Sequence, residues 1–299
     1  MNTIRKEPLD YAKVWENIVN ALINYLEKYN LQSMILGVSG GIDSTVTAAI
    51  CCEVCKRTAN KKLIGMSLMT KTNEQDEVNS ADLVGVEFCT EYQKIQINDE
   101  YETLNKLCER ISGNNTNLTN GNIKARMRMI ILFDASAKHK GIVLSNSNKT
   151  EALLGFSTLG ADSLGAIALI NELYKTEVYE FAKWINENIY PDSQALPMSI
   201  NLTPTDGNGV AAGGDMAQIA PGHTYNDVDD ILMTYMEYSG HHPEEYQIAM
   251  NELNDKYGAD TVERVISRHR SSQFKRYHLP LIIDPETGEI LQNNFSPVK

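Results

Sequence analysis

The chain has 299 residues, of which 42% are hydrophobic and 22% are charged, the composition of an ordinary soluble globular protein. The formal net charge of −12 argues against a nucleic-acid partner, because phosphate backbones are bound by basic surfaces. No stretch is long and apolar enough to cross a membrane, and residues 1–8 lack the apolar centre of a signal peptide.

Strand-like apolar runs and helical periodicities alternate along the first two thirds of the chain. In chain order they predict a helix at about 10–29, a strand at 34–38, a helix to about 57, a strand at 63–68, a helix at 75–87, a strand at 93–97, a helix at 99–111, a polar loop at 112–121, a helix at 122–138, a strand at 141–145, and helices at 149–155 and 175–188. This alternation predicts the α/β class, with an open parallel sheet and helices on both faces.

The last third has a different pattern. Residues 191–223 are rich in Pro and Gly, including the run 206–214, and are interpreted as a long flexible loop that forms a lid. Helices at about 224–238, 243–255 and 258–269 and an extended tail follow. We therefore expect one domain over 1–299, divided into an α/β core at 10–190, a lid at 191–223 and a helical C-terminal part at 224–280.

A glycine turn, Ser39-Gly40-Gly41-Ile42-Asp43-Ser44, joins the first predicted strand to its helix. Two glycines let the backbone approach an anion closely, and the first helical N–H groups favour negative charge there. The turn lacks the lysine of a Walker A loop and carries Asp43 instead, so the anion is expected to arrive with a cation. A plain capped turn is the alternative, but it does not require two hydroxyls, two glycines and an acid.

Ligands of open parallel sheets bind beyond the carboxyl ends of the strands. We therefore expect residues 39–44, 69–75 and 145–151, which follow the first, second and fourth strands, to converge on one site. The five cysteines (Cys51, Cys52, Cys55, Cys89 and Cys108) are odd in number, which disfavours a disulfide framework and favours a reducing cytoplasm. Cys52 and Cys55 are interpreted as helix packing, with redox or sulfur chemistry as the alternative.

Three acids lie nearest the predicted strand ends: Asp43, Glu151 and Asp162. Hard divalent cations prefer carboxylate oxygens, so these acids are candidates for a magnesium site. Alternatively, Glu151 is a first-turn acid favoured by the helix dipole, and Asp162 is a lone acid in an apolar run. Lys175 either neutralises phosphates or is a solvated lysine.

Further segments carry a resemblance to one family. The glycine turn resembles the signature of the ATP pyrophosphatases. Residues 120–129 are similar to the Gly-Asn-x-x-Ala-Arg-x-Arg-Met motif of the NAD synthetases, and residues 145–158 resemble their Asn-Lys-Ser/Thr-Glu block. Residues 173–176 follow at the family's distance, and 274–276 resemble its basic Lys-Arg pair. The resemblance extends over about 10–280.

The resemblance implies an adenine nucleotide alpha-hydrolase-like fold and synthesis of NAD from deamido-NAD, ATP and ammonia through an acyl-adenylate. It implies catalytic roles for Asp43 and Lys175 and magnesium binding by Asp43, Glu151 and Asp162. The implied ATP-binding residues are Gly37, Ser39, Gly40, Gly41, Asp43, Ser44, Asn146, Lys175 and Ser199. The implied deamido-NAD-binding residues are Asn122, Arg126, Asp162 and Lys275.

Partners follow from length and from the family. No residues remain for a glutaminase module, so free ammonia is the expected nitrogen donor, with supply by a separate subunit as the alternative. The family generally forms homodimers, and the first helix, with apolar residues that look exposed, is a candidate interface. Arg126 and Arg128 lie two apart on a helix, so only one is expected to face substrate; the motif points to Arg126, which leaves Arg128 as a surface charge. Residues 264–276 hold five cations and no acid, which suggests anion capture or a solvated face.

Three positions depart from the family pattern. Asn146 stands where Thr is usual, Ala166 where a second Asp is usual, and Asn201 where an acid is usual. The run 206–214 is also longer than the usual loop. Two other functions remain open: a different ATP pyrophosphatase that modifies tRNA, and a non-catalytic nucleotide-binding homologue.

Overall fold

The computed structural model describes residues 8–162, 164–203, 219–277 and 280–291. Within these ranges seven strands form one sheet in the order β3-β2-β1-β4-β5-β6-β7. Their bounds are β1 Ser33–Gly37, β2 Lys62–Met69, β3 Glu91–Gln96, β4 Gly141–Ser145, β5 Ile167–Ala168, β6 Leu281–Ile283 and β7 Ile290–Leu291. Neighbouring strands are parallel except β6 and β7. The predicted parallel sheet is confirmed, whereas β5 and the antiparallel β7 were not predicted.

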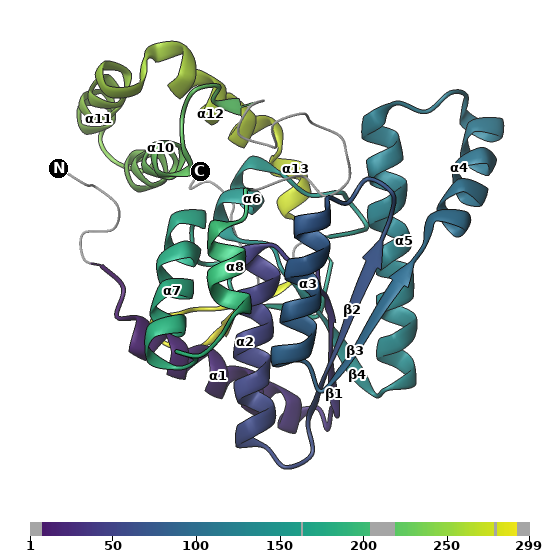
Figure 1. Cartoon of the computed structure of the whole chain (residues 1–299). Helices are drawn as coiled ribbons and strands as arrows, with labels where there is room; N and C mark the ends of the chain where they lie inside the picture. Colours follow the sequence, from purple (N-terminus) through teal and green to yellow (C-terminus); the bar gives the residue numbers. More distant parts are fainter. Residues whose placement is uncertain (1–7, 163, 204–218, 278–279, 292–299) are drawn as a thin grey trace.

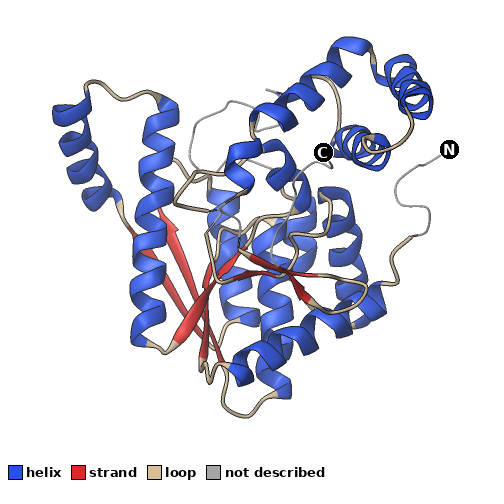
Figure 2. Cartoon of the chain, turned by 180° about the vertical axis from the view of Figure 1, so that it is seen from behind, coloured by secondary structure: helices blue, strands red, loops and turns tan. Residues whose placement is uncertain are grey.

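Helices cover both faces of this sheet (Figures 1 and 2). Their bounds are α1 Tyr11–Lys28, α2 Ile42–Arg57, α3 Gln75–Phe88, α4 Asn98–Ser112, α5 Asn117–Lys138, α6 Lys149–Leu154, α7 Lys175–Asn188, α8 Ala195–Asn201, α10 Tyr225–Tyr238, α11 Pro243–Tyr257, α12 Ala259–Ser271 and α13 Gln273–Arg276. None of these described helices combines the length and apolarity that a membrane span requires.

The central strand β1 shows why the sheet is buried on both sides. Met34 and Leu36 pack into the core beneath α1, α2, α3, α7 and α8, whereas Ile35 packs against α5 on the opposite face. Successive side chains of a strand point to opposite faces, so a strand covered on both sides reads as a continuous apolar run. Residues 34–38 have this pattern, and β1 lies between β2 and β4.

The apolar face of α1 is buried in this core. Trp15 is 1% exposed and packs near Phe181, Trp184 and Tyr190, and the other buried apolar residues of α1 are Val14, Ile18, Val19, Ala21, Leu22 and Leu26. The expectation that these residues are exposed and form a subunit interface is therefore wrong. Their helical spacing reflects packing within the chain.

Two predicted loops contain helices. α5 begins at Asn117, inside the predicted polar loop 112–121, because Thr116 caps it: the Thr119 N–H donates to Thr116 Oγ1 at 3.2 Å. α8 occupies residues 195–201 of the predicted lid, and its N-terminal N–H groups at Gln194 and Ala195 donate to Glu87 Oε1 of α3. The Gly-rich run 206–214 lies outside the described residues.

The helices α10, α11 and α12 form a second apolar core with α6, lined by residues such as Leu153, Ile231 and Val265. Figure 1 shows this part of the chain at the end of the sheet where the strands finish. The predicted extended tail contains the short helix α13, and the strands β6 and β7 are the extended segments that follow it. Residues 281–291 therefore return to the sheet, where β6 pairs with β5.

Candidate active site

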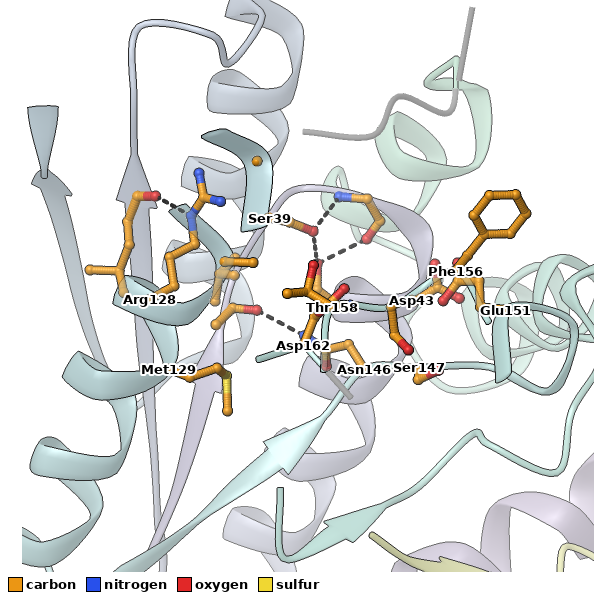
Figure 3. A pocket seen from close by; sticks show the side chains of 18 of the residues that line it. Ser39, Asp43, Arg128, Met129, Asn146, Ser147, Glu151, Phe156, Thr158 and Asp162 are labelled. Atoms are coloured by element: carbon orange, nitrogen blue, oxygen red, sulfur yellow. Dashed lines mark hydrogen bonds between the residues drawn. The ribbon is translucent and has the colours of Figure 1, made fainter. Parts of the chain in front are cut away.

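A cavity of about 690 Å³ opens at the carboxyl ends of the strands. Residues after β1, β2 and β4 all line it, which confirms the predicted convergence of these three strand ends. Figure 3 shows Asp43, Ser147, Glu151 and Phe156 on one side and Arg128 and Met129 across from them. The predicted site residues that line the cavity are Gly37, Ser39, Gly41, Asp43, Ser44, Asn122, Arg126, Asn146, Glu151, Asp162, Lys175, Ser199 and Lys275.

The glycine turn is held by its own hydroxyls. The Gly41 N–H donates to Ser39 Oγ at 3.2 Å, and Ser44 Oγ donates to the Gly41 carbonyl at 3.0 Å. Thr45 Oγ1 donates to the same carbonyl at 3.0 Å. These bonds fix the first turn of α2, whose N-terminal N–H groups and dipole favour an anion.

Gly40 packs against a neighbouring helix and is not among the described residues that line the cavity. It has φ +85° and is buried against α3, where Ser80 Oγ donates to its carbonyl at 2.7 Å. A Cβ at this position would lie 2.3 Å from the Glu77 carbonyl oxygen. Only glycine fits both the backbone angle and the contact.

Lys175 joins the two acids at the edge of the cavity. Its Nζ lies 2.5 Å from Asp43 Oδ2 and 3.2 Å from Glu151 Oε1. Burial favours the neutral amine, but the carboxylates of Asp43 and Glu151 outweigh it and hold the pKa of Lys175 well above its usual value. Only 6% of the side chain is exposed, so the interpretation of Lys175 as a solvated lysine is wrong.

Neighbouring residues orient this cluster. Asn148 Nδ2 donates to Asp43 Oδ1 at 2.8 Å, and Asn148 Oδ1 caps α6 by accepting from the Glu151 N–H at 3.0 Å. Lys149, by contrast, pairs with Glu172 at 2.8 Å, and Glu172 does not line the cavity in the described structure. The Asn-Lys-Thr-Glu block therefore contributes its Asn and Glu to the site, while its Lys makes a structural pair.

Asp162 lies apart from the other two acids. Its Oδ1 accepts the Thr158 N–H at 2.7 Å, and Thr158 Oγ1 in turn donates to Asn122 at 2.8 Å. No three His, Cys, Asp or Glu side chains within the described ranges are grouped closely enough to hold a metal ion. The predicted set of Asp43, Glu151 and Asp162 is thus not assembled here, and a magnesium-binding role for Asp162 stays a prediction.

Both arginines of α5 line the cavity. Arg126 is exposed and donates from Nε to the Leu159 carbonyl at 3.1 Å, whereas Arg128 is half-buried and donates from Nε to the Leu68 carbonyl at 2.8 Å. The expectation that Arg128 is a surface charge is wrong. A long side chain reaches around the helix, so spacing in sequence did not decide its direction.

Three further residues that line the cavity were not predicted as site residues from the sequence: Phe156, Tyr225 and Arg268. The Arg268 guanidinium lies 5.2 Å from the centre of the Phe156 ring, and the centre of the Tyr225 ring lies 5.6 Å from Lys175 Nζ. Phe156 and Arg268 belong to segments that the sequence had marked. Tyr225 begins α10, and no local signal indicated that this helix reaches the site.

Of the three departures from the family pattern, only Asn146 lines the cavity among the described residues. Its Nδ2 donates to the Gly37 carbonyl at 2.9 Å and so links β1 to the strand end of β4. Ala166 packs against the main core, and Asn201 is exposed at the end of α8, donating to the Pro197 carbonyl at 2.8 Å. Neither of these two residues is positioned to contact a ligand in the cavity.

The basic segment 264–276 surrounds the C-terminal end of α6. Arg276 Nη1 donates to the Leu153 carbonyl at 2.9 Å, and Arg268 Nε donates to the Leu154 carbonyl at 2.8 Å. Lys275 Nζ donates to the Gly155 and Ser157 carbonyls at 2.7 and 2.6 Å. Cations are favoured at this negative end of a helix, which explains why the segment carries no compensating acids.

His269 makes this segment sensitive to acid. It is 1% exposed, with Nδ1 at 3.1 Å from the Leu153 carbonyl, and burial together with Arg276 lowers its pKa to about 4. The unfolded chain therefore binds more protons between pH 6.5 and 4, so stability falls as the pH is lowered through this window. We expect His269→Gln to reduce the loss of unfolding free energy between pH 7 and 4.5 by on the order of 2 kcal/mol. Urea titrations at both pH values measure it, and the exposed His139→Gln should keep the wild-type pH dependence.

Comparison with known proteins gives consistent results. A family model described as NAD synthase matches residues 14–279. An NH(3)-dependent NAD(+) synthetase of Finegoldia magna is 31% identical over 225 residues, covering 75% of this chain and 86% of the relative. A glutamine-dependent NAD(+) synthetase of Aquifex aeolicus is 28% identical, covering 93% of this chain and 46% of the relative. The solved structure of an NMN synthetase from Francisella tularensis shares the fold, with a TM-score of 0.71, 22% identity and coverage of 90% and 97%.

Proposed function

The chain belongs to the NAD synthase family, and from that premise we propose that it makes NAD from deamido-NAD, ATP and ammonia. In the first step the nicotinate carboxylate attacks the α-phosphorus of ATP, forming an acyl-adenylate and releasing pyrophosphate. In the second step ammonia attacks the acyl carbon, loses a proton to solvent or base, and expels AMP. The products are NAD, AMP and pyrophosphate.

One observation carries this proposal: the Lys175 ammonium lies between Asp43 and Glu151, directly beside the glycine turn. The leaving pyrophosphate would be bound by the turn's N–H groups and by the hydroxyls of Ser39 and Ser44. Lys175 would offset the charge that develops as the α–β bond breaks. Such fixed charges and donors stabilise a transition state without a covalent enzyme intermediate.

The acids beside Lys175 fit magnesium. Mg²⁺ is usually bound through one or two carboxylates together with substrate phosphates, so a complete cage of protein ligands is not required. The carboxylates of Asp43 and Glu151 lie close together, because each has an oxygen beside the Lys175 ammonium, at 2.5 and 3.2 Å. These two acids would hold magnesium next to the glycine turn, where phosphate is proposed to bind. Magnesium there would offset phosphate charge and orient the leaving group.

The rest of the cavity suits the remaining parts of the substrates. Its apolar lining is suited to a purine ring, and the residues that provide it are Val38, Met66, Met129, Leu132 and Leu144. Arg126, Arg128 and Lys275 supply positive charge on other sides, which would favour the phosphates and carboxylate of deamido-NAD. An acidic chain thus presents cations where an anionic substrate would bind.

Free ammonia as the nitrogen source is supported by the similarity to the Finegoldia magna relative, an NH(3)-dependent synthetase that is 31% identical and of which this chain covers 86%. The chain covers 46% of the glutamine-dependent relative. The test is to incubate the protein with Mg-ATP and deamido-NAD, adding either ammonium or glutamine, and to quantify NAD and AMP. Ammonium-dependent NAD and AMP in equal amounts would support the proposal. AMP formed only with tRNA, binding without AMP, or NAD formed only from glutamine would each contradict it.

We also propose that the protein acts as a homodimer. Exposed apolar side chains gather on α4 and α5 rather than on α1, and they are Leu107, Ile111, Leu118, Ile130 and Phe133. Leu118 also lines the cavity, so a second copy on this face would adjoin the site.

Light scattering should give twice the chain mass, 66.8 kDa from 33.4 kDa. Ile130→Asp should shift it toward the monomer, and a wild-type monomer would refute the dimer.

A further inference from the structure

Asp229 is a fully buried carboxylate outside the cavity, on the helix α10 of the C-terminal part. Thr150 Oγ1 donates to its Oδ1 at 2.5 Å, and the Thr176 N–H donates to its Oδ2 at 2.9 Å. Thr150 belongs to α6 and Thr176 to α7, the two helices whose first turns carry Glu151 and Lys175. One side chain from a distant part of the sequence therefore bonds to both supporting helices.

The same hydrogen-bond network includes the backbone of Lys175. Thr150 Oγ1, while donating to Asp229, accepts the Lys175 N–H at 2.8 Å. The N–H groups at the start of a helix have no partner within the helix. Here the first two of α7 are bonded by the Thr150 hydroxyl and the Asp229 carboxylate, and the negative charge lies at the positive end of the helix. We call Asp229, Thr150 and the two N–H groups the Asp229 clamp.

The Asp229 clamp contains a carboxylate at a buried position, where burial disfavours the charged form. Burial raises the pKa of Asp229 to about 6, against the hydrogen bonds from Thr150 and Thr176, and Glu177 adds repulsion. An apolar residue would avoid this free-energy cost but would leave buried N–H and hydroxyl donors unpaired. The geometry therefore indicates that the role of Asp229 is to hold Thr150 and the first turn of α7 in position.

We infer that Asp229 is a positioning residue for the reaction proposed above, holding Lys175 and Glu151 at the distances from Asp43 that phosphate chemistry requires. It acts through Thr150 and through the backbone of α7, and it contacts no substrate. The C-terminal helices thus complete the site that the sheet provides. This inference rests on the proposed function for its kinetic test but not for its binding test.

The matched pair of variants is Asp229→Asn and Asp230→Asn. In Asp229→Asn the new amide has one acceptor oxygen for the two donors, Thr150 Oγ1 and the Thr176 N–H. The clamp therefore loses its negative charge and one of its two accepted hydrogen bonds, with little change in volume. Asp230 is also buried, yet it bonds to Lys256 and Tyr257 of α11 at 2.8 and 2.6 Å, away from the site. Asp229→Asn is expected to lower kcat tenfold to about a hundredfold, with KM for deamido-NAD changed by less than about threefold. Asp230→Asn should lower the melting temperature and keep kcat within about twofold.

A second pair of variants tests the same clamp if Asp229→Asn does not fold. Thr150→Val removes the hydroxyl at nearly constant volume and should lower kcat by at least about tenfold. Thr150→Ser keeps the hydroxyl and should recover most of that loss. If Asp229→Asn and Thr150→Val both keep wild-type kcat, or if serine does no better than valine, the clamp does not position the site.

A binding measurement separates the two proposals. If the wild type forms no NAD, the proposed function fails, and the clamp is then judged by calorimetric affinity for Mg-ATP alone. We expect Asp229→Asn to weaken that affinity by at least about tenfold and Asp230→Asn to leave it unchanged. Equal affinity in the wild type and Asp229→Asn would overturn the inference whatever the acceptor substrate is.

Discussion

Replacement of Asp43 by Asn is expected to reduce AMP release in the presence of deamido-NAD by at least about a hundredfold. In the structure Asp43 accepts from Lys175 on one oxygen and from Asn148 on the other, at 2.5 and 2.8 Å. Asparagine can keep the bond to Asn148 but turns an N–H group toward the ammonium. Lys175 then loses its nearer carboxylate, and magnesium loses one of its two candidate ligands.

The fold should survive this substitution, because Asp43 is only partly buried in the first turn of α2. Chromatographic measurement of AMP and pyrophosphate, with circular dichroism to check folding, gives the comparison. The control is Asp134→Asn, which breaks an exposed pair with Lys138 and should keep wild-type turnover. Near-normal AMP release from Asp43→Asn would remove this carboxylate from the mechanism.

Local signals explain which parts of the molecule the sequence could predict. The buried strand, the glycine turn and α2 follow one another within 25 residues, and each has its own pattern of apolar residues, glycines or helix formers. The expected convergence of strand ends needed only the parallel topology, which the alternation of elements indicated. Asp43 and Glu151 could therefore be placed near one another without coordinates, whereas only the family resemblance assigned Lys175 to the same site.

The misses share a different cause, which is partners distant in the chain. α8 depends on Glu87 of α3 to cap its first turn, so its seven residues alone carried too weak a signal. Asp229 and Thr150 lie 79 positions apart, and no spacing rule connects them. The same holds for Arg268 and Leu154, 114 positions apart. Tertiary packing brings the C-terminal helices to the site, and a single sequence does not record such packing.

The α5 start was missed for a local reason. The segment before Asn117 is rich in Asn, Thr and Gly, and these residues favour turns and helix caps alike. Thr116 and Thr119 make reciprocal bonds, with the Thr116 N–H donating to Thr119 Oγ1 at 2.7 Å. Threonine at the third helical position replaces the Glu or Gln usual in a capping box. A composition rule alone therefore assigned a loop where a capped helix begins.

Gly40→Ala is expected to cause the largest loss of stability of the substitutions considered, and also a large loss of activity. The added Cβ would lie 2.3 Å from the Glu77 carbonyl oxygen and 2.8 Å from the Ala81 nitrogen, both backbone atoms of α3. Neither can move without displacing the helix, and φ +85° adds strain of about 1–2 kcal/mol for alanine. With overpacking, the unfolding free energy should fall by on the order of 3 kcal/mol.

The activity lost by Gly40→Ala should exceed what its loss of stability explains, because the displaced turn carries the N–H groups that are proposed to bind pyrophosphate. A shift of about 1 Å is sufficient for a hundredfold fall in kcat. Gly258→Ala is the matched control: it has the same φ of +85°, but no atom lies within 4 Å of the added Cβ. It should lose only the strain energy and keep kcat, as measured by urea unfolding and NAD formation. If the two alanines cost the same free energy and leave kcat equal, close packing of the glycine turn against α3 does not hold the phosphate site in place.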